Sequence, residues 1–155
     1  MLFLSDMENV TNRRLDYLRA QIGRAQAESP SPLGRWLNGT IRLAEYGKLV
    51  ADFIVRQELT NPAGVLHGGA AAAILDDLLG TMVFALGREY AYTSVNLSVD
   101  FLHVARLGEV VTATAEVVRA GKNIIHGEGR IMSFDGKVVA KCTTNLIQTS
   151  AKLIL

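Results

Sequence analysis

The chain lacks the features that mark secreted, disulfide-stabilised or nucleic-acid-binding proteins. Its 155 residues include one cysteine, three prolines and one tryptophan, and the formal net charge is only +1. A single cysteine, Cys142, excludes an internal disulfide framework and suits a reducing compartment, so we expect a cytoplasmic protein. A nearly neutral chain has no strong positive electrostatic potential, so we expect no nucleic-acid partner.

Signals for export or membrane insertion are also missing. The first residues, MLFLSDMENVTNRR, have a short apolar patch with no basic region before it, which differs from a secretory signal. Residues 68–87 form an apolar run of nearly spanning length, but Asp76 and Asp77 lie in its middle. Each central aspartate costs roughly 2.5–3.5 kcal/mol on insertion, so the run is predicted to be a buried helix and no membrane partner is expected.

Motifs for several kinds of chemistry are absent as well. His67, His103 and His126 are scattered, and no cysteine cluster accompanies them, so we expect no metal site. The sequence has no Gly-x-Ser-x-Gly elbow and no glycine-rich phosphate loop, which argues against a serine hydrolase and a nucleotide-dependent enzyme.

The patterns that are present predict a helix, a hairpin, a second long helix and four strands. Apolar residues recur at helical spacing within 6–27, and ESPSPLG then ends this helix. Strand-like runs follow at 40–56 (split by Gly47), 92–104, 109–118, 123–133 and 137–149. Residues 1–35 are thus predicted to be a helical extension, and 36–150 an α+β domain whose curved antiparallel sheet wraps around the helix at 68–87.

Alternation along the strands predicts which residues face the core. In 92–104, one face is expected to carry Val95, Leu97, Val99 and Phe101, and the other Ser94, Asn96, Ser98 and Asp100. In 109–118, the core face is expected to carry Val111, Ala113, Ala115 and Val117. Cys142 is in phase with Ala140 and Leu146 on the last strand, so it is expected to be a small core residue rather than a nucleophile.

The two adjacent aspartates of the long helix are its most informative residues. Apolar residues surround them on every side of the predicted helix, whereas a surface helix would gather its charges on one face. We therefore expect at least one of Asp76 and Asp77 to be buried or to line a cavity, where the pKa of a carboxyl tends to rise. Such a group either serves the function of the protein or is paired with a partner that the sequence does not reveal.

The His-Gly-Gly at the start of the helix adds a second candidate feature. The N–H groups of a first helical turn have no intrahelical partners, and they point positive charge at a carbonyl oxygen that gains negative charge. Gly68 and Asp76 would lie about 12 Å apart along the helix. One subunit cannot easily aim both groups at one carbonyl, so the spacing favours a two-fold dimer with shared sites.

These residues carry a resemblance to a known family. The stretch NPAGVLHGGAAAAILD, residues 61–76, resembles the signature of hotdog-fold acyl-CoA thioesterases of the phenylacetate-pathway type and their mitochondrial relatives. In that family an asparagine precedes Gly-x-Leu-His-Gly-Gly, and an aspartate follows nine residues after the histidine; Asn61, His67 and Asp76 match. The resemblance extends over roughly residues 40–148 and implies the hotdog fold, without a metal or cofactor.

The resemblance also implies roles for individual residues. Asp76 would be the general base or the nucleophile at the thioester, and the Gly68 backbone N–H would polarise its carbonyl. Asn61 and His67 would shape the loop, and Ser94 would hydrogen-bond near the carboxylate. Asp77 matches no position of known role, so a polar contact of the helix or a place in an interface is the favoured interpretation.

Two further segments are implied to bind coenzyme A (CoA), namely those that match Phe101–Arg106 and Arg119–Ile124. The residues concerned are Phe101, His103, Arg106, Arg119, Gly121 and Lys122. Arg119 and Lys122 flank a glycine turn and suit phosphates as cations, but they equally suit a solvated hairpin end. Val104 stands where many relatives have a proline, so the shape of this loop departs from the family pattern.

The family resemblance favours an enzyme that hydrolyses an aromatic or medium-chain acyl-CoA to the free acid and CoA. The alternative is a hotdog protein that binds acyl-CoA as a sensor without turning it over, and a hotdog dehydratase or hydratase ranks third. Hotdog proteins of this type pair into dimers and often assemble further, so we expect a homotetramer made of two dimers.

Overall fold

The computed structural model describes residues 12–154. Its helices are α2 (Arg13–Ala20), α3 (Pro32–Leu37), the short 3₁₀ helix η1 (Gln57–Leu59) and α4 (Gly68–Phe84). Its strands are β1 (Thr40–Glu45), β2 (Lys48–Ile54), β3 (Tyr90–Phe101), β4 (Val110–Ala120), β5 (Ile124–Ser133) and β6 (Val138–Lys152).

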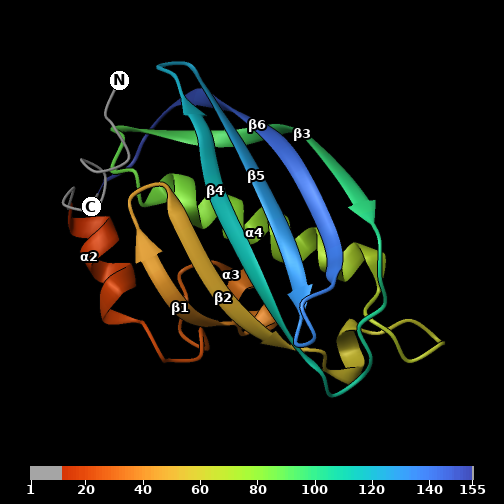
Figure 1. Cartoon of the computed structure of the whole chain (residues 1–155). Helices are drawn as coiled ribbons and strands as arrows, with labels where there is room; N and C mark the ends of the chain where they lie inside the picture. Colours follow the sequence, from red (N-terminus) through yellow and green to blue (C-terminus); the bar gives the residue numbers. More distant parts are fainter. Residues whose placement is uncertain (1–11, 155) are drawn as a thin grey trace.

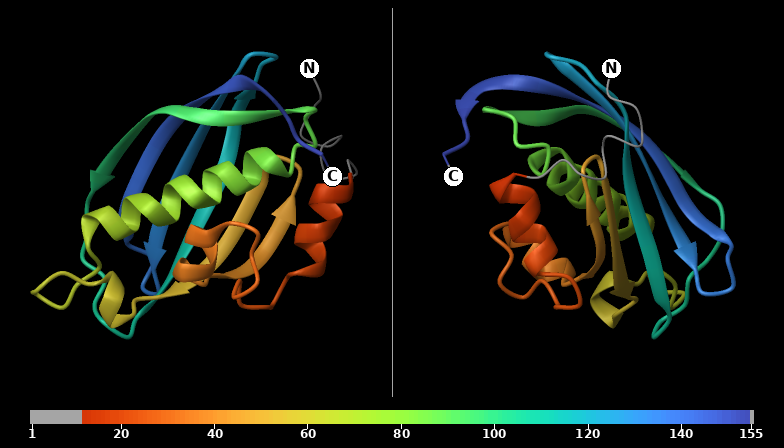
Figure 2. Two further views of the ribbon diagram at one scale, coloured as in Figure 1. Left: turned by 180° about the vertical axis from the view of Figure 1, so that it is seen from behind. Right: turned by 60° about the vertical axis from the view of Figure 1, so that its left-hand side comes forward.

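The strands form one antiparallel sheet in the order β1-β2-β4-β5-β6-β3. The sheet curves around α4, which lies across its concave face, while α2 and α3 lie beside β1 on the helical side (Figure 1, Figure 2). This arrangement confirms the predicted α+β class, with a curved antiparallel sheet wrapped around the long helix and an added N-terminal helix.

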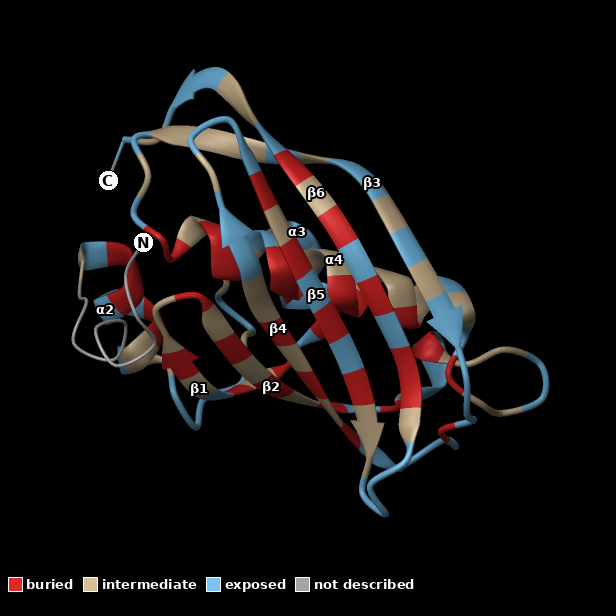
Figure 3. Cartoon of the chain, turned by 45° about the horizontal axis from the view of Figure 1, so that its top comes forward, coloured by how far each residue is buried: buried red, intermediate tan, exposed pale blue. Residues whose placement is uncertain are grey.

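Strand alternation places the core between the sheet and α4. On β4, Val111, Ala113 and Ala115 are fully buried, as predicted, and buried residues alternate with exposed ones along β5 (Figure 3). A Cβ atom added to Gly129 of β5 would lie 3.1 Å from the side chain of Leu75 on α4. Small residues on the central strands therefore let the helix approach the sheet closely.

The predicted turns are confirmed by backbone geometry. Gly47 joins β1 to β2 with a φ of +79°, and Gly136 in the FDG turn joins β5 to β6 with a φ of +80°. Residues other than glycine rarely adopt such angles, so both positions depend on the missing side chain.

The N-terminal helix is shorter than predicted. The part of the prediction at residues 6–11 lies outside the described residues, and beyond Ala20 the chain turns rather than continuing as a helix to residue 27. Gly23 has a φ of +80°, and its N–H donates to the carbonyl of Ile41. The backbone after α2 therefore bonds to the start of β1, which overrides the helical spacing of the sequence.

Helix α3 was not predicted, because the two prolines were interpreted only as a stop. Ser31 is its N-cap, with a side-chain oxygen that accepts from the Gly34 N–H, and Pro32 is its first residue. Serine followed by proline is a typical helix start, so the signal was present. The predicted domain boundary after residue 35 falls within this helix and stays a prediction.

Strand β3 departs from the strict alternation predicted for 92–104. Ser94 pairs with Leu146 and Asn96 with Asn145, so Val95 is an extra, bulged residue that is 61% exposed. The bulge shifts the pattern by one residue: Leu97 and Val99 still pack on the core, but Ser94 faces the same side as they do. The prediction that Val95 shares the core face and Ser94 the other face is therefore wrong.

None of the helices within residues 12–154 is long and apolar enough to cross a membrane.

Candidate active site

Asp76 lies in the middle of α4 and is half-buried. The hydroxyl of Ser94 on β3 donates a hydrogen bond to its Oδ1 atom, with 3.1 Å between the oxygens. This contact depends on the β3 bulge, which turns Ser94 towards the helix; bulges often re-aim a side chain beside an active site. The carboxylate is therefore held in a fixed position with its second oxygen free of any bond among the described residues.

Asp77, one residue further along α4, has a different partner. The hydroxyl of Ser31 at the start of α3 donates to its Oδ1 atom at 2.8 Å. Burial raises the pKa of the Asp77 carboxyl; the Ser31 hydrogen bond acts in the opposite direction and the negative charge of Asp76 adds to the rise. Asp77 thus makes the polar contact that was expected of it, to a segment that was not expected to reach it.

Both aspartates line one cavity of about 480 Å³ between α4, the sheet and the N-terminal residues. Its lining is mixed. Apolar residues at its wall include Leu18, Ile41, Leu49, Phe53, Leu78 and Phe84, and polar ones include Ser31, Thr81 and Ser94. Its volume and its apolar wall with a few convergent polar groups are typical of a site for a small organic ligand.

The start of α4 has the geometry expected of an anion-stabilising turn. His67 is the N-cap, and its Nδ1 atom accepts from the N–H of Gly69 at 2.8 Å. No acceptor among the described residues bonds to the Gly68 N–H, which leaves that donor available. A Cβ atom added to Gly68 would lie 3.3 Å from the ring of Phe101, so the first turn of α4 lies against the end of β3.

Asn61 shapes the loop that leads to this turn. Its side-chain oxygen accepts from the N–H groups of Ala63 and Val65, at 3.0 and 3.4 Å. Its own backbone N–H donates to the Val65 carbonyl. The side-chain oxygen is therefore occupied within the loop in this subunit and supports the path of the chain towards His67.

The predicted site residues fall into two groups within one subunit. Gly68 and Asp76 lie on the same straight helix, eight residues and thus about 12 Å apart. The two segments implied to bind CoA are further apart. Lys122 lies by the start of β3, where the Tyr92 hydroxyl donates to its carbonyl, whereas Phe101 ends that strand. A strand of twelve residues spans about 36 Å, so one subunit does not bring these segments together.

Five of the six implied CoA-binding residues are exposed, and the sixth, Gly121, is half-buried. Phe101 is 58% exposed, and His103, Arg106, Arg119 and Lys122 are all exposed. Phe101 and His103 also line a small cavity with Leu66 and Gly68. These side chains are available for a ligand or for another copy of the chain.

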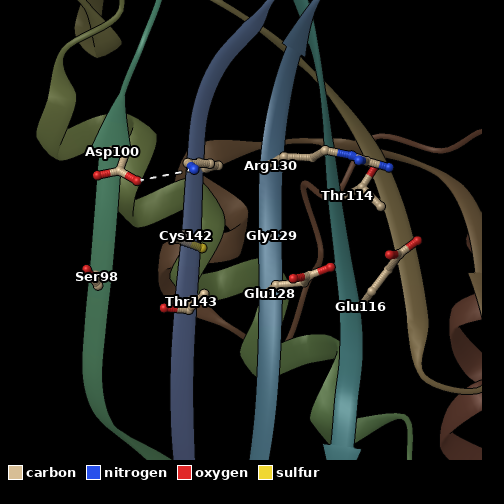
Figure 4. A pocket seen from close by; sticks show the side chains of 10 residues that line it. Ser98, Asp100, Thr114, Glu116, Glu128, Gly129, Arg130, Cys142 and Thr143 are labelled. Atoms are coloured by element: carbon tan, nitrogen blue, oxygen red, sulfur yellow. Dashed lines mark ion pairs between the residues drawn. The ribbon is translucent and has the colours of Figure 1, made fainter.

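A second groove lies on the outer face of the sheet, away from α4. Its volume is about 270 Å³, and Asp100, Glu116, Glu128 and Arg130 are among the residues that line it (Figure 4). Glu116 forms an ion pair with Lys48, at 2.6 Å. Lys141 forms an ion pair with Asp100, at 3.6 Å.

Cys142, the residue after Lys141 on β6, is buried, and burial raises the pKa of its thiol to about 11. A protonated thiol is a poor nucleophile, which agrees with its predicted core role. Within residues 12–154, no cluster of three or more His, Cys, Asp and Glu residues could hold a metal ion.

The geometry is that of a hotdog-fold protein with a carboxylate in its central helix, and comparison with known proteins identifies the family. The family model described as "Thioesterase superfamily" matches residues 63–140. The chain therefore belongs to the thioesterase superfamily. The matched residues run from the loop before His67 to the start of β6, and include Asp76 and Ser94.

Individual relatives agree with this membership. Human acyl-coenzyme A thioesterase 13 is 32% identical over 85 residues, which cover 55% of this chain and 61% of that protein. The E. coli PaaI protein from the phenylacetic acid degradation operon has the same fold, with a TM-score of 0.79, 18% identity, and 94% of this chain and all of that chain covered. A thioesterase protein of Streptococcus pneumoniae TIGR4, solved with coenzyme A, has a TM-score of 0.70 and 25% identity, covering 75% of this chain and 89% of that one.

One residue of the site was missed in the sequence. Ser31 contacts Asp77 across 46 positions of the chain, and no local pattern links the two. Only the Ser-Pro start of α3 could have shown that Ser31 has a structural role.

Proposed function

We propose that this protein is an acyl-CoA thioesterase that hydrolyses an aromatic or medium-chain acyl-CoA to the free acid and CoA. The observation that carries the proposal is the Asp76 carboxylate, held by Ser94 at the wall of a largely apolar cavity in a chain of the thioesterase superfamily. The apolar wall suits an acyl group, and the S. pneumoniae protein was solved with coenzyme A.

Asp76 can act by either of two routes. As a general base, it removes a proton from a water molecule whose oxygen attacks the thioester carbon; the C–S bond breaks, and the CoA sulfur leaves and is protonated. As a nucleophile, its oxygen attacks the same carbon to form a mixed anhydride, which water then hydrolyses. Both routes need the carboxylate beside the same carbon and a donor for the carbonyl oxygen.

The donor is the Gly68 N–H of a second subunit. Strand β3 is an edge of the sheet with Val95 exposed, and an open edge is a template for pairing with another chain. Antiparallel pairing of two β3 edges sets the end of one strand, with Gly68 and Phe101 beside it, against the start of the other. It also joins the two CoA-binding segments, Phe101–Arg106 of one copy and Arg119–Ile124 of the other.

Two such dimers form a homotetramer in this proposal. The outer face of the sheet carries charges of both signs, Glu116 and Glu128 beside Arg130 and Lys141. A two-fold interface places the same patch on both partners, so mixed charges allow this face to be self-complementary. The single, buried Cys142 suits the cytoplasm.

The test is CoA release, followed with a thiol reagent, over acetyl-, hexanoyl-, palmitoyl-, benzoyl- and phenylacetyl-CoA. We expect Asp76→Asn to lower kcat by about 10²–10⁴-fold, since that is what a positioned acid–base group contributes. Asp135→Asn, the same change in the exposed β5–β6 turn, is the matched control and keeps wild-type rates.

The outcomes separate the enzyme from its alternative. Wild-type protein that binds these thioesters but releases no CoA is the sensor rather than the thioesterase. Equal turnover by wild type and a folded Asp76→Asn variant removes Asp76 from the chemistry.

A further inference from the structure

Part of the wall of the cavity beside Asp76 lies outside the residues that the family model matches, namely the N-terminal residues of the chain and Ile41, Leu49, Ala51 and Phe53 of β1 and β2. Residues 12–39, here called the N-terminal segment, lie outside the matched region at 63–140. They nevertheless supply a large share of the lining: Tyr17, Leu18, Gln26, Ser29, Pro30, Ser31, Gly34 and Gly39. The opposite wall is the start of β3, from Tyr92 to Ser94.

One side-chain contact joins the middle of the N-terminal segment to α4. The Ser31 hydroxyl donates to Asp77 at 2.8 Å and accepts from the Gly34 N–H at 3.0 Å. Gly34 fits closely here, because an added Cβ atom would lie 3.1 Å from the second oxygen of Asp77. The backbone of α3 is thus brought directly against the Asp77 carboxylate.

Other contacts fix the two ends of the segment, and at its start they also join it to the end of α4, where the Asn12 side chain donates to the Ala85 carbonyl at 3.0 Å. The Arg56 guanidinium donates to the carbonyls of Trp36 and Leu37 at 2.6 and 2.8 Å. Towards the other end, the Arg14 guanidinium stacks over the Phe84 ring at 5.0 Å. Between these ends, the Ser31 hydroxyl makes the side-chain hydrogen bond that joins residues 29–34 to α4.

The cavity follows α4 from Asp76 to Phe84, which are eight residues and so about 12 Å apart. Phe84, with Leu18 of α2, lines the end of the cavity that lies away from Asp76. An acyl chain whose thioester carbon lies at Asp76 runs towards this end, between the N-terminal segment and β3.

We propose that Ser31 and Asp77 are specificity-determining residues: their hydrogen bond holds the N-terminal segment over the cavity and limits the substrate to compact acyl groups, aromatic or medium-chain. This inference rests on the proposed thioesterase function and names what selects its substrate. Asp76 performs the chemistry, and Asp77 positions the N-terminal segment, which limits the size of the acyl group.

The experiment measures the ratio of kcat/KM for palmitoyl-CoA to that for hexanoyl-CoA. We expect wild type to prefer hexanoyl-CoA strongly. Ser31→Ala and Asp77→Ala each remove the hydrogen bond, and we expect each to raise the ratio about tenfold, which is within the range of discrimination that a pocket contact supplies. The double variant raises it no further than either single variant, because the two residues act through one contact.

Two controls separate the contact from general destabilisation. Ser31→Thr keeps a hydroxyl and keeps the wild-type ratio. Ser133→Ala removes the hydroxyl that donates to Asp135 in the exposed β5–β6 turn, a matched serine–aspartate contact away from the cavity, and leaves the ratio unchanged.

Trp36 gives a readout that does not depend on catalysis. It is the only tryptophan of the chain, lies in α3 and is 48% exposed. Acrylamide quenching of its fluorescence should increase in Ser31→Ala and Asp77→Ala, but not in Ser31→Thr or Ser133→Ala, because α3 moves away from α4 when the hydrogen bond is lost.

The results that overturn the proposal are distinct from failure of the thioesterase itself. If folded Ser31→Ala and Asp77→Ala keep both the wild-type ratio and the wild-type quenching, the contact does not set the wall. If these variants do not fold, the wild-type protein still gives a test. Hydrolysis of palmitoyl-CoA by wild type as fast as hydrolysis of hexanoyl-CoA is then enough to refute the proposal. If wild type hydrolyses no thioester, the proposed function fails. Quenching together with the affinities for the two thioesters, measured by calorimetry, then decides the inference.

Discussion

Two serine–aspartate pairs face the same cavity from opposite walls, and they differ in origin. Ser94 and Asp76 are 18 positions apart, within the region that matches the thioesterase superfamily. Ser31 and Asp77 are 46 positions apart, and Ser31 lies outside that region. Adjacent residues of one helix thus contact two different parts of the chain, one shared with the family and one not covered by the match.

The physical reason is the pitch of the helix. Consecutive residues of an α-helix point about 100° apart, so Asp76 and Asp77 cannot share one partner strand. Asp76 points to β3, whose bulge brings Ser94 to the inner face, and Asp77 points to α3. We infer that this division separates the chemistry from the choice of substrate.

After Asp76→Asn, the largest expected effect is at Gly68, which lies within the region that matches the thioesterase superfamily, and it tests whether the Gly68 N–H is the donor to the thioester carbonyl. Gly68→Pro removes the backbone N–H at the first position of α4, where proline is tolerated, and kcat should fall by about 10²–10³-fold, as for loss of an oxyanion donor. Gly68→Ala, which adds the same Cβ beside Phe101 but keeps the N–H, should retain most activity.

Mixing the two inactive proteins sharpens this test. If Asp76 of one subunit works with Gly68 of the other, subunit exchange between Asp76→Asn and Gly68→Pro restores one intact site in each mixed dimer. With two-fold symmetry and random pairing this recovers about a quarter of wild-type activity. No recovery, with exchange verified by mass, means that the two groups do not meet across a dimer.

A smaller effect is expected at Ser94, which in the proposed mechanism positions the Asp76 carboxylate. Ser94→Ala removes its hydrogen bond to Asp76, and kcat should fall roughly 10- to 100-fold, since hydrogen bonds to charged groups contribute about 1.5–3 kcal/mol. KM for hexanoyl-CoA should change little. Ser98→Ala, on the outward face of the same strand, is the control, and an equal loss there contradicts the positioning role.

The smallest expected effect is the pH dependence of the free energy of unfolding in Asp77→Asn. It distinguishes Asp77 from an ordinary surface aspartate. The pKa of its carboxyl is raised in the folded protein above the ordinary 3.8, chiefly by burial. The folded state therefore binds its proton more tightly than the unfolded state, and wild type loses stability relative to Asp77→Asn as the pH rises through the folded pKa. Urea unfolding between about pH 4 and pH 7 should show the advantage of Asp77→Asn growing with pH.

Asp135→Asn gives the opposite case for this measurement. Hydrogen bonds from Ser133 and Lys137 lower the pKa of the Asp135 carboxyl to about 2. Its contribution to stability is therefore lost only as the pH falls from about 3.8 towards 2, so the difference between wild type and Asp135→Asn should be nearly constant between about pH 4 and pH 7. A pH-independent difference for Asp77→Asn as well would show that burial does not raise the pKa of Asp77.

The amino-acid sequence determined the central helix, the turns at Gly47 and Gly136, the antiparallel strands and the candidate role of Asp76. These features depend on periodicity, glycine geometry and a compact motif, each of which is written within a short stretch of chain. The predicted extent of the N-terminal helix was wrong, because the backbone beyond Ala20 forms hydrogen bonds with β1. This contact joins residues that are distant in the sequence.

Only the tertiary structure decided which side chains meet. The bulge at Val95 turns Ser94 towards α4, and Ser31 forms a hydrogen bond with Asp77. The N-terminal segment forms part of the cavity wall. Local preferences specify helices and strands, but a one-residue change of strand register or the docking of a distant helix is decided by packing of the whole chain.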